Sequence, residues 1–396
     1  MEVLIIGGGL AGLSCARWLY EQGREVLVLE KEQRVGGRVA TDEHEGYLLD
    51  RGFQVLVTAY PDPAEALDYE SLALHAFQPS ARIWKEGKLH RLGDPLRSPG
   101  DLLPTVFSGL ASLGDKMRVM KLRTMLWFYG GGTPHRPTTT NRYLRDFGFS
   151  PRFVESFFRP FAGGAFFDRE LTTSSRKFET LFANFAVGKA SLPARGMRAI
   201  PEQLAGRLPP GCVRTGVEAL RLGDREVETS SGEILKARAV VLAGASQEHR
   251  LHGSPPPRYF GTWCHYYSTA CPPIQEPVLV LNGEPSGRVN HLAILSAVAP
   301  SYAPPGRALI SVTALEEGSV IEQLELWFGT EVYGWEPLKT YHIPEALPHE
   351  PRSNIRPVQL SDHLFVCGDH RQTGSIQGAL SCGRRAAAAV LDYLVS

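Results

Sequence analysis

The amino-terminal segment constrains the fold more than any other part of this chain. Apolar residues 3–6 lead into the glycine-rich turn 7–12, after which apolar side chains recur at helical spacing through Tyr20. This order predicts a strand, a tight turn and a helix. Residues 25–30 predict a second strand that ends in Glu30, 18 residues beyond Gly12. The pattern G-x-G-x-x-G followed by an acid at this spacing is typical of a dinucleotide-binding turn.

Each part of this pattern has a physical role in binding a dinucleotide. Gly7 permits the tight turn, Gly9 lets the backbone approach a pyrophosphate, and Gly12 lets the helix pack closely on the strand. The first amides of the helix, at Leu10 and Ala11, then face the phosphates. The acid that ends the second strand accepts hydrogen bonds from ribose hydroxyls, which favours a cofactor with a free 2′-hydroxyl.

The next segment distinguishes between dinucleotides. Gly36 and Gly37 follow the acid closely, and Arg38 is placed to reach the same pyrophosphate. A plain NAD-binding domain has no need of these residues, so they favour FAD. The alternative interpretation is a surface loop with turn glycines and a solvated arginine.

The segment 7–38 resembles the amino terminus of a flavin-dependent superfamily that includes amine oxidases, protoporphyrinogen oxidases and phytoene or carotenoid desaturases. Residues 49–54, Leu-Asp-Arg-Gly-Phe-Gln, resemble the family's D-x-G element, which runs beside the flavin ring. Residues 192–201 resemble its P-x-G-G-M segment, with Arg195 in place of the first glycine.

A second resemblance lies at the other end of the chain. Residues 364–369 form an apolar run that ends in Gly368-Asp369, and residues 374–384 follow as a turn and a helix. This order resembles the family's closing FAD motif. The resemblance implies that Asp369 bonds the ribityl or pyrophosphate part of FAD, and that the helix near Ile376 aims its amides at the pyrimidine end of the flavin. The alternative is an ordinary strand-to-turn junction and a docking helix.

Residues 212–245 contain alternating strands and glycine turns, which predict a β-meander. The family resemblance implies that the backbone of Val217 lies against the adenine and that Ala243 passes close to the nucleotide; a plain core valine is the alternative for Val217. The complete set of residues expected to bind FAD is Gly7, Gly9, Leu10, Ala11, Gly12, Glu30, Lys31, Gly37, Arg38, Gly52, Phe53, Gln54, Val217, Ala243, Gly368, Asp369, Ser375 and Ile376.

The length of 396 residues predicts two or three domains. We expect an α/β fold with a Rossmann-like FAD-binding domain, built around a central parallel sheet and a β-meander, from residues 1–58, 186–245 and 351–396. Two inserts, residues 59–185 and 246–350, are expected to form an α+β substrate-binding domain.

Composition excludes several other classes. The 42 basic and 42 acidic side chains leave no basic excess for nucleic acid. Six scattered cysteines without a C-x-x-C pair predict neither a metal module nor a disulfide framework, and they favour a reducing compartment. The first strand starts at residue 3 and no apolar run approaches 20 residues, so we expect neither a signal peptide nor a transmembrane helix. These features predict a cytoplasmic protein without a bound metal.

Two segments of the first insert bear on the substrate. Residues 102–113 are nearly uncharged and precede a basic segment, 116–123. They predict either a peripheral membrane-surface entrance or, as the favoured alternative, a buried helix beside a solvated basic face. The aromatic segment 157–168 predicts a hydrophobic pocket or ordinary core.

With FAD bound, the cofactor carries the chemistry. No Ser-His-Asp, Cys-His or H-E-x-x-H arrangement is apparent. His265, His342 and His370 are expected to be structural rather than catalytic; His370, which follows the Gly-Asp pair, and Gln54 are the best catalytic candidates. The closing motif lacks an aromatic residue before Gly378 and a cysteine that could tether the flavin, which favours noncovalent FAD and disfavours amine oxidation.

Residues 52–61 and 341–348 look more like desaturase-type members of the superfamily. The leading prediction is an FAD-dependent oxidoreductase that moves a hydride equivalent from a hydrophobic, isoprenoid- or tetrapyrrole-like substrate to flavin N5. The first alternative is an amine oxidase that releases hydrogen peroxide, with an aromatic cage from Tyr259, Phe260 or Trp335. The second is a noncatalytic carrier of a prenyl chain or a protein. The oligomeric state is left open.

Overall fold

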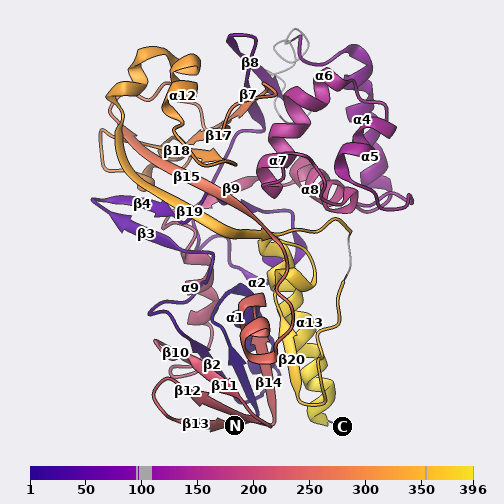
Figure 1. Ribbon diagram of the computed structural model, residues 1–396, viewed down its shortest axis with the longest axis vertical. Coiled ribbons are helices and arrows are strands. Elements are labelled where there is room, and N and C mark those ends of the chain that lie inside the picture. The colour runs from indigo at the N-terminus through magenta and orange to yellow at the C-terminus, as the bar shows by residue number, and fades with distance from the viewer. Residues whose placement is uncertain (95–96, 98–108, 353–354, 396) are drawn as a thin grey trace.

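The computed structural model describes residues 1–94, 97, 109–352 and 355–395. A five-stranded parallel sheet occupies the lower half of the molecule in Figure 1. Strands β1, β2 and β20 are buried along their whole length, as expected where both faces of a parallel sheet are covered. Segments far apart in the sequence thus meet in one sheet. Its strand order is β10 (Val213–Thr215), β2 (Val26–Glu30), β1 (Val3–Ile6), β14 (Ala239–Ala243) and β20 (Leu364–Cys367).

Different elements cover the two faces of this sheet. Helices α1 (Leu10–Glu21) and α13 (Ile376–Val395) pack against each other on one face. They approach so closely that a Cβ on Gly383 would lie 2.3 Å from the carbonyl oxygen of Ala11. The other face is covered by the antiparallel strands β11 (Ala219–Leu222), β12 (Glu226–Thr229) and β13 (Ile234–Lys236). The expected parallel sheet and β-meander are confirmed.

A seven-stranded mixed sheet forms the upper part of the molecule (Figure 1). Strand β16 pairs with β7 in parallel, with Leu279 opposite Ala81, and the other neighbours are antiparallel. This pairing joins the two inserts in one sheet. The strand order is β19 (Glu336–Pro348), β15 (Tyr259–Thr269), β18 (Ala308–Ala314), β17 (Val289–Ile294), β16 (Leu279–Asn282), β7 (Ser80–Lys85) and β8 (Lys88–Gly93).

A group of helices lies beside this sheet, at the upper right of Figure 1. Its core is aromatic, with Phe158 and Phe178 fully buried. Ser112 caps α4 by accepting a hydrogen bond from the Asp115 amide, so the helix begins at Leu113. Helix α4 contains the basic segment 116–123, whereas residues 102–108 of the uncharged stretch lie outside the described residues. The helices are α4 (Leu113–Phe128), α5 (Thr140–Asp146), α6 (Pro151–Phe153), η2 (Val154–Phe158), α7 (Arg159–Phe166) and α8 (Ser175–Val187).

Asp50 ties the two parts of the molecule together. Its buried carboxylate accepts hydrogen bonds from the Thr41 hydroxyl (2.5 Å), the Met197 amide (3.0 Å) and the Tyr302 hydroxyl (2.9 Å). The aspartate of the D-x-G element is therefore a structural junction.

The remaining elements connect these layers. They are β3 (Thr41–His44), β4 (Tyr47–Asp50), β5 (Leu56–Val57), α2 (Pro61–Ala66), β6 (Leu74–Ala76), β9 (Ala190–Pro193), α9 (Ala199–Gly206), α10 (Ala245–Gln247), η3 (Glu248–His252), α11 (Leu295–Val298), η4 (Pro300–Tyr302), α12 (Ile321–Phe328), η5 (Gly329–Gly334) and η6 (Asp369–Arg371).

Candidate functional site

A cavity of about 1310 Å³ extends from the carboxyl ends of the parallel strands to the upper sheet and its helices. The carboxyl edge of an open parallel sheet is where such folds bind ligands. Seventeen of the eighteen residues expected to bind FAD line it: Gly7, Gly9, Leu10, Ala11, Gly12, Glu30, Lys31, Gly37, Arg38, Gly52, Phe53, Gln54, Ala243, Gly368, Asp369, Ser375 and Ile376.

The glycine turn brings bare backbone to the cavity wall. Gly7 has a φ of +118°, and a Cβ on Gly12 would lie 2.0 Å from the Gly7 carbonyl oxygen. Gly9 precedes α1, which has no side-chain cap, so the first amides of the helix stay free for an anionic ligand.

Glu30 is fixed at the end of β2. Its side chain accepts hydrogen bonds from the amides of Gly8 (2.7 Å) and Glu32 (2.9 Å). Glu30 is only 6% exposed. The carboxylate is therefore held in one orientation at the cavity wall.

Arg38 and Asp369 both line the cavity and form an ion pair of 2.5 Å. Arg38 also donates to the carbonyl of Ala346 on β19. The N-terminus of α13 lies beside this pair, where the Ser375 hydroxyl accepts a hydrogen bond from the Gly378 amide at 2.9 Å. A cation, an acid and a helix N-terminus thus converge on one region.

Phe53 and Gln54 continue the wall toward the upper sheet. The Gln54 side-chain amide donates to the Arg38 carbonyl at 2.9 Å, which leaves its Oε1 oxygen as an acceptor. That oxygen is buried and has no hydrogen-bond partner among the described residues.

Comparison with protein families identifies the chain. The model of the family described as flavin containing amine oxidoreductase matches residues 10–258 and 276–391. The chain belongs to this family. Its fold class and the family resemblance expected from the sequence are confirmed.

Curated relatives of this flavin-containing amine oxidoreductase match over short segments. Protoporphyrinogen oxidase 2 of Arabidopsis thaliana is 29% identical over 126 residues, which cover 32% of this chain and 24% of that protein. The 4,4'-diapolycopen-4-al dehydrogenase of Metabacillus indicus is 46% identical over 52 residues, or 13% and 11% of the two chains. Polyamine oxidase 2 of Arabidopsis thaliana is 48% identical over 51 residues, or 13% and 10%. The matches span between 7% and 27% of such relatives' own lengths.

Solved structures match over nearly the whole chain. An oxidoreductase from Methanosarcina mazei has a TM-score of 0.76 at 16% identity and covers 99% of this chain and 100% of its own. Putrescine oxidase bound to putrescine has a TM-score of 0.71 at 16% identity, covering 99% of both chains. At these identities the likeness shows the fold.

The residues of the cavity fit FAD, the cofactor that the family implies. A Cβ on Gly9 would meet nothing closer than the Gly36 carbonyl oxygen at 3.9 Å, so open space lies over the turn for a pyrophosphate. The fixed carboxylate of Glu30 suits a ribose, and the α13 N-terminus suits the anionic end of a flavin. The part of the chain that the structure describes holds no helix long and apolar enough to cross a membrane. Nor do those residues include a group of three or more His, Cys, Asp or Glu side chains that could bind a metal.

Val217 and His370 lie outside the described lining of the cavity. The Val217 amide donates to the Glu30 carbonyl at 3.0 Å, and its side chain packs under the meander. His370 Nε2 pairs with Glu248 at 2.9 Å. Burial opposes ionisation of Glu248, but hydrogen bonds from His370 and Arg371 hold its pKa at about 2. This contact joins the ring of His370 in η6 to η3.

The distal end of the cavity is apolar, and the sequence predicted only some of the residues that line it. Phe153, Phe157 and Phe161 lie four residues apart and stack successively, with centroids 5.4 and 5.5 Å apart, along the wall. Phe158 and Phe166 of the same segment are buried in the core. Some rings of the aromatic segment therefore line a hydrophobic pocket, and others belong to the core, so each of the two interpretations holds for part of the segment. The four-residue spacing is the signal that identifies the lining rings.

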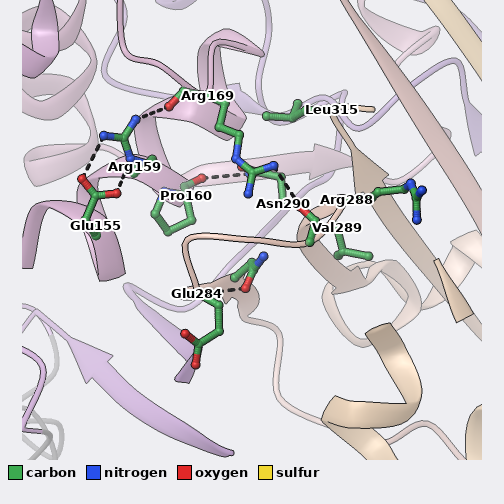
Figure 2. A pocket seen from close by; sticks show the side chains of 11 residues that line it. Glu155, Arg159, Pro160, Arg169, Glu284, Arg288, Val289, Asn290 and Leu315 are labelled. Carbon is green, nitrogen blue, oxygen red and sulfur yellow. Dashed lines mark hydrogen bonds and ion pairs between the residues drawn. The ribbon is translucent and has the colours of Figure 1, made fainter. Parts of the chain in front are cut away.

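A second, much smaller pocket lies between α7 and β17 (Figure 2). Its volume of about 20 Å³ suits a single water molecule. Arg159 pairs with Glu155, and Arg169 donates to backbone carbonyls. The charged side chains of this pocket are therefore engaged in contacts within the protein.

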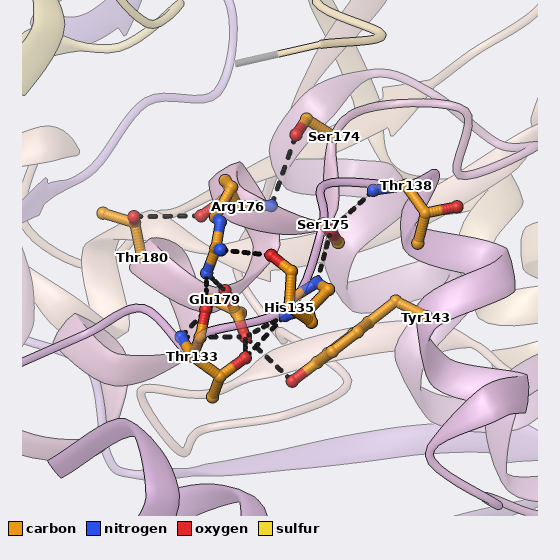
Figure 3. A network of polar contacts seen from close by, with 9 residues as sticks. All are labelled: Thr133, His135, Thr138, Tyr143, Ser174, Ser175, Arg176, Glu179 and Thr180. Carbon is orange, nitrogen blue, oxygen red and sulfur yellow. Dashed lines mark hydrogen bonds and ion pairs between the residues drawn. The ribbon is translucent and has the colours of Figure 1, made fainter. Parts of the chain in front are cut away.

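A polar network joins α8 to residues 133–138 (Figure 3). Ser175 Oγ lies 3.1 Å from His135 Nε2, and the buried Glu179 binds Thr133, Tyr143 and Arg176. The order Ser-His-Glu resembles a hydrolytic triad, but Ser175 is fully buried and its hydroxyl already accepts from the Thr138 amide. The network fixes the segment onto the helix.

Proposed function

We propose that this chain is an FAD-dependent oxidoreductase that dehydrogenates a hydrophobic substrate and binds FAD noncovalently. The observation that carries the proposal is the continuity of the cavity from the glycine turn to the stacked rings of Phe153, Phe157 and Phe161. Its volume of about 1310 Å³ exceeds the roughly 300–1,000 Å³ of an ordinary ligand pocket. Such a volume suits a dinucleotide together with an elongated substrate.

FAD, when bound, supplies a ring that accepts a hydride equivalent from a substrate carbon. The chain's own residues bind the cofactor and orient it. We assign the backbone at Gly9 and the side chain of Arg38 to the pyrophosphate, Glu30 to the ribose, and the amides of α13 to the anionic end of the ring. We propose that the segments 1–58, 186–245 and 351–396 form the FAD-binding domain and the two inserts the substrate domain.

The substrate that we favour is isoprenoid- or tetrapyrrole-like. The distal cavity wall supports this class because it presents aromatic rings and aliphatic side chains such as Val119 and Leu181. The names of two relatives, a protoporphyrinogen oxidase and a diapolycopenal dehydrogenase, point in the same direction.

Visible spectroscopy tests the proposal in two steps. Purified protein should carry, or take up, FAD that acid precipitation releases, since noncovalent FAD leaves the chain on denaturation. Anaerobic holoenzyme should then be bleached by an apolar isoprenoid or a porphyrinogen. Colourless protein that cannot be reconstituted would instead indicate a noncatalytic carrier.

Amine oxidation is the second candidate. It is favoured by the likeness to polyamine oxidase 2 and by Tyr259, which lines the cavity. Trp335, by contrast, is buried against Tyr267 and lies outside the described lining. Rapid bleaching of the flavin by an amine, with hydrogen peroxide release in air, would favour amine oxidation over dehydrogenation of a hydrophobic substrate.

We also propose peripheral membrane contact through α4. Helix α4 lines the cavity through Val119 and Met120, and its end exposes Trp127 (80%) and Phe128. Aromatic side chains next to basic ones suit a membrane interface. Protein should float with anionic phosphatidylserine vesicles, and Trp127→Ser should reduce flotation. Leu326→Ser, on α12 where Leu326 is 72% exposed, should leave flotation unchanged.

A further inference from the structure

Asn290 and His291 are neighbours on β17, and their side chains meet although adjacent residues of a regular strand point to opposite faces. The pairing of β17 with β18 shifts register here, since Val289 lies opposite Ala314 while His291 lies opposite Thr313. The extra residue forms a β-bulge at Asn290. Bulges re-aim side chains and are over-represented next to active sites.

The Asn290 side chain sets the tautomer of His291. Asn290 Nδ2 donates to the Pro160 carbonyl oxygen at 2.9 Å (Figure 2). A carbonyl can only accept, so this contact fixes which end of the amide carries the hydrogens. The same Nδ2 lies 3.0 Å from His291 Nδ1, which must therefore accept. In the neutral ring the proton then sits on Nε2.

The ring is neutral and its N–H group lacks a partner. Burial lowers the pKa of His291 to about 3. His291 is 3% exposed, and Nε2 has no hydrogen-bond partner among the described residues. Buried polar groups in folded proteins are nearly always hydrogen-bonded. A donor left over at a cavity wall calls for an acceptor on a ligand.

His291 lines the cavity where the two parts of the molecule meet. Its ring contacts Phe53 edge-on, with centroids 4.7 Å apart. Gly164 of α7 makes room, because a Cβ there would lie 2.4 Å from Asn290 Nδ2 and 2.9 Å from His291 Nδ1. The bulge, the glycine and the carbonyl of Pro160 together hold Nδ1 against Asn290, while Nε2 has no partner in the part of the chain that the structure describes.

We propose that His291 binds the substrate by donating its Nε2 hydrogen to an oxygen acceptor, and that Asn290 is the positioning residue that holds the ring in this tautomer. The inference rests on the proposed function. It narrows the substrate class to hydrophobic molecules that carry a carbonyl, carboxylate or hydroxyl oxygen. A pure hydrocarbon has no acceptor for this group, and a protonated amine has only donors.

Binding of two matched probes to the protein tests the inference. The probes are geranylgeranial, an isoprenoid aldehyde, and the hydrocarbon with the same carbon skeleton, each titrated by quenching of tryptophan fluorescence. Wild-type protein should bind the aldehyde more tightly. His291→Phe should weaken aldehyde binding by about tenfold, the size expected for one neutral hydrogen bond, and leave hydrocarbon binding within twofold. His291→Gln, which keeps an N–H donor, should recover part of the preference.

His265→Phe is the matched control, because His265 also has an unpartnered Nε2 but lies outside the described cavity lining. It should not change the preference for the aldehyde. Equal binding of both probes, binding of neither, or equal weakening of both in His291→Phe would overturn the inference. So would a shift of the flavin absorption maximum in ligand-free His291→Phe holoenzyme, because the donor would then serve the cofactor.

The experiments distinguish a failure of the proposed oxidoreductase function from a failure of the proposed role of His291. FAD content is measured on the same samples, and loss of FAD binding in wild-type protein would refute the oxidoreductase. The fluorescence titration needs no turnover, so it reports on His291 in either case.

Discussion

Single residues at the cavity wall act through geometry that their neighbours impose. Glu30 shows this clearly, because two backbone amides hold its carboxylate and leave it no freedom to turn. A glutamine at this position offers one oxygen where the glutamate offers two.

Glu30→Gln should therefore weaken FAD binding. Hydrogen bonds to charged groups contribute about 1.5–3 kcal/mol, which corresponds to roughly tenfold to a hundredfold in affinity. Titration of apoprotein with FAD, followed by flavin fluorescence, measures the change. Glu25→Gln, at an exposed position before β2, should bind as the wild type does; equal affinity of all three proteins would refute the role of Glu30.

At the scale of elements, close packing of helices on strands depends on glycine residues, which have no side chain. Gly12 lies inside α1, where a Cβ would meet the Gly7 carbonyl oxygen at 2.0 Å and the Ala243 side chain at 2.9 Å. The first contact is with the turn that precedes the helix, and the second is with the last residue of β14.

Gly12→Ala should displace α1 from β1 and β14, because backbone cannot move aside as a flexible side chain can. Overpacking of this kind costs about 1–3 kcal/mol of stability, and FAD binding should be lost with the turn. Urea unfolding and flavin content measure both effects. Gly206→Ala is the control, since a Cβ there meets nothing within 4 Å. Unchanged flavin content in Gly12→Ala would contradict the expectation.

The junction at Asp50 joins β3, η4 and the segment before α9, and it should make stability depend on pH. Burial raises the pKa of Asp50 to about 6, although hydrogen bonds from Thr41 and Met197 oppose the rise. The folded state therefore holds the proton more tightly than the unfolded state does. The stabilisation is present in full below pH 4 and is lost as the pH rises through 6.

Asp50→Asn keeps the shape of the junction without the titration. Between pH 4 and 7 the wild type should lose about 2–3 kcal/mol of unfolding free energy relative to this variant. Urea denaturation across that range measures the difference. Asp392→Asn, at an exposed position on α13, should follow the wild type. Parallel curves for wild type and Asp50→Asn would refute the assignment.

At the scale of the whole molecule, the cavity belongs to both sheets, since its wall runs from the ends of β2 and β14 and the start of α1 to β19. FAD should therefore stabilise the entire chain. A ligand at a hundred times its Kd adds about 2.7 kcal/mol. Calorimetry should show one transition that moves to higher temperature with FAD; a separate transition that FAD leaves in place would contradict a shared site.

The sequence predicted what short segments determine by themselves. Each of these features lies at the end of a strand: the glycine turn after β1, Glu30 in β2 and the Gly368-Asp369 pair after β20. A short stretch of sequence is therefore enough to predict them, and these residues line the cavity. The donor at His291 could not be predicted, because its tautomer depends on Pro160 from another insert and on a bulge set by β18. The rings of Phe153, Phe157 and Phe161 are an intermediate case. Their four-residue spacing can be read from the sequence, but their exposure to the cavity depends on how the two parts of the molecule pack.

The strand order of the lower sheet also has a consequence for synthesis of the chain. Strand β1, made first, has β14 as one neighbour, and β14 in turn needs β20 beyond residue 363. The α13 N-terminus, which completes the cofactor cavity, comes later still. A nascent chain therefore cannot complete the cofactor cavity until synthesis has passed residue 376, and until then β1 and β14 lack part of the sheet that buries them.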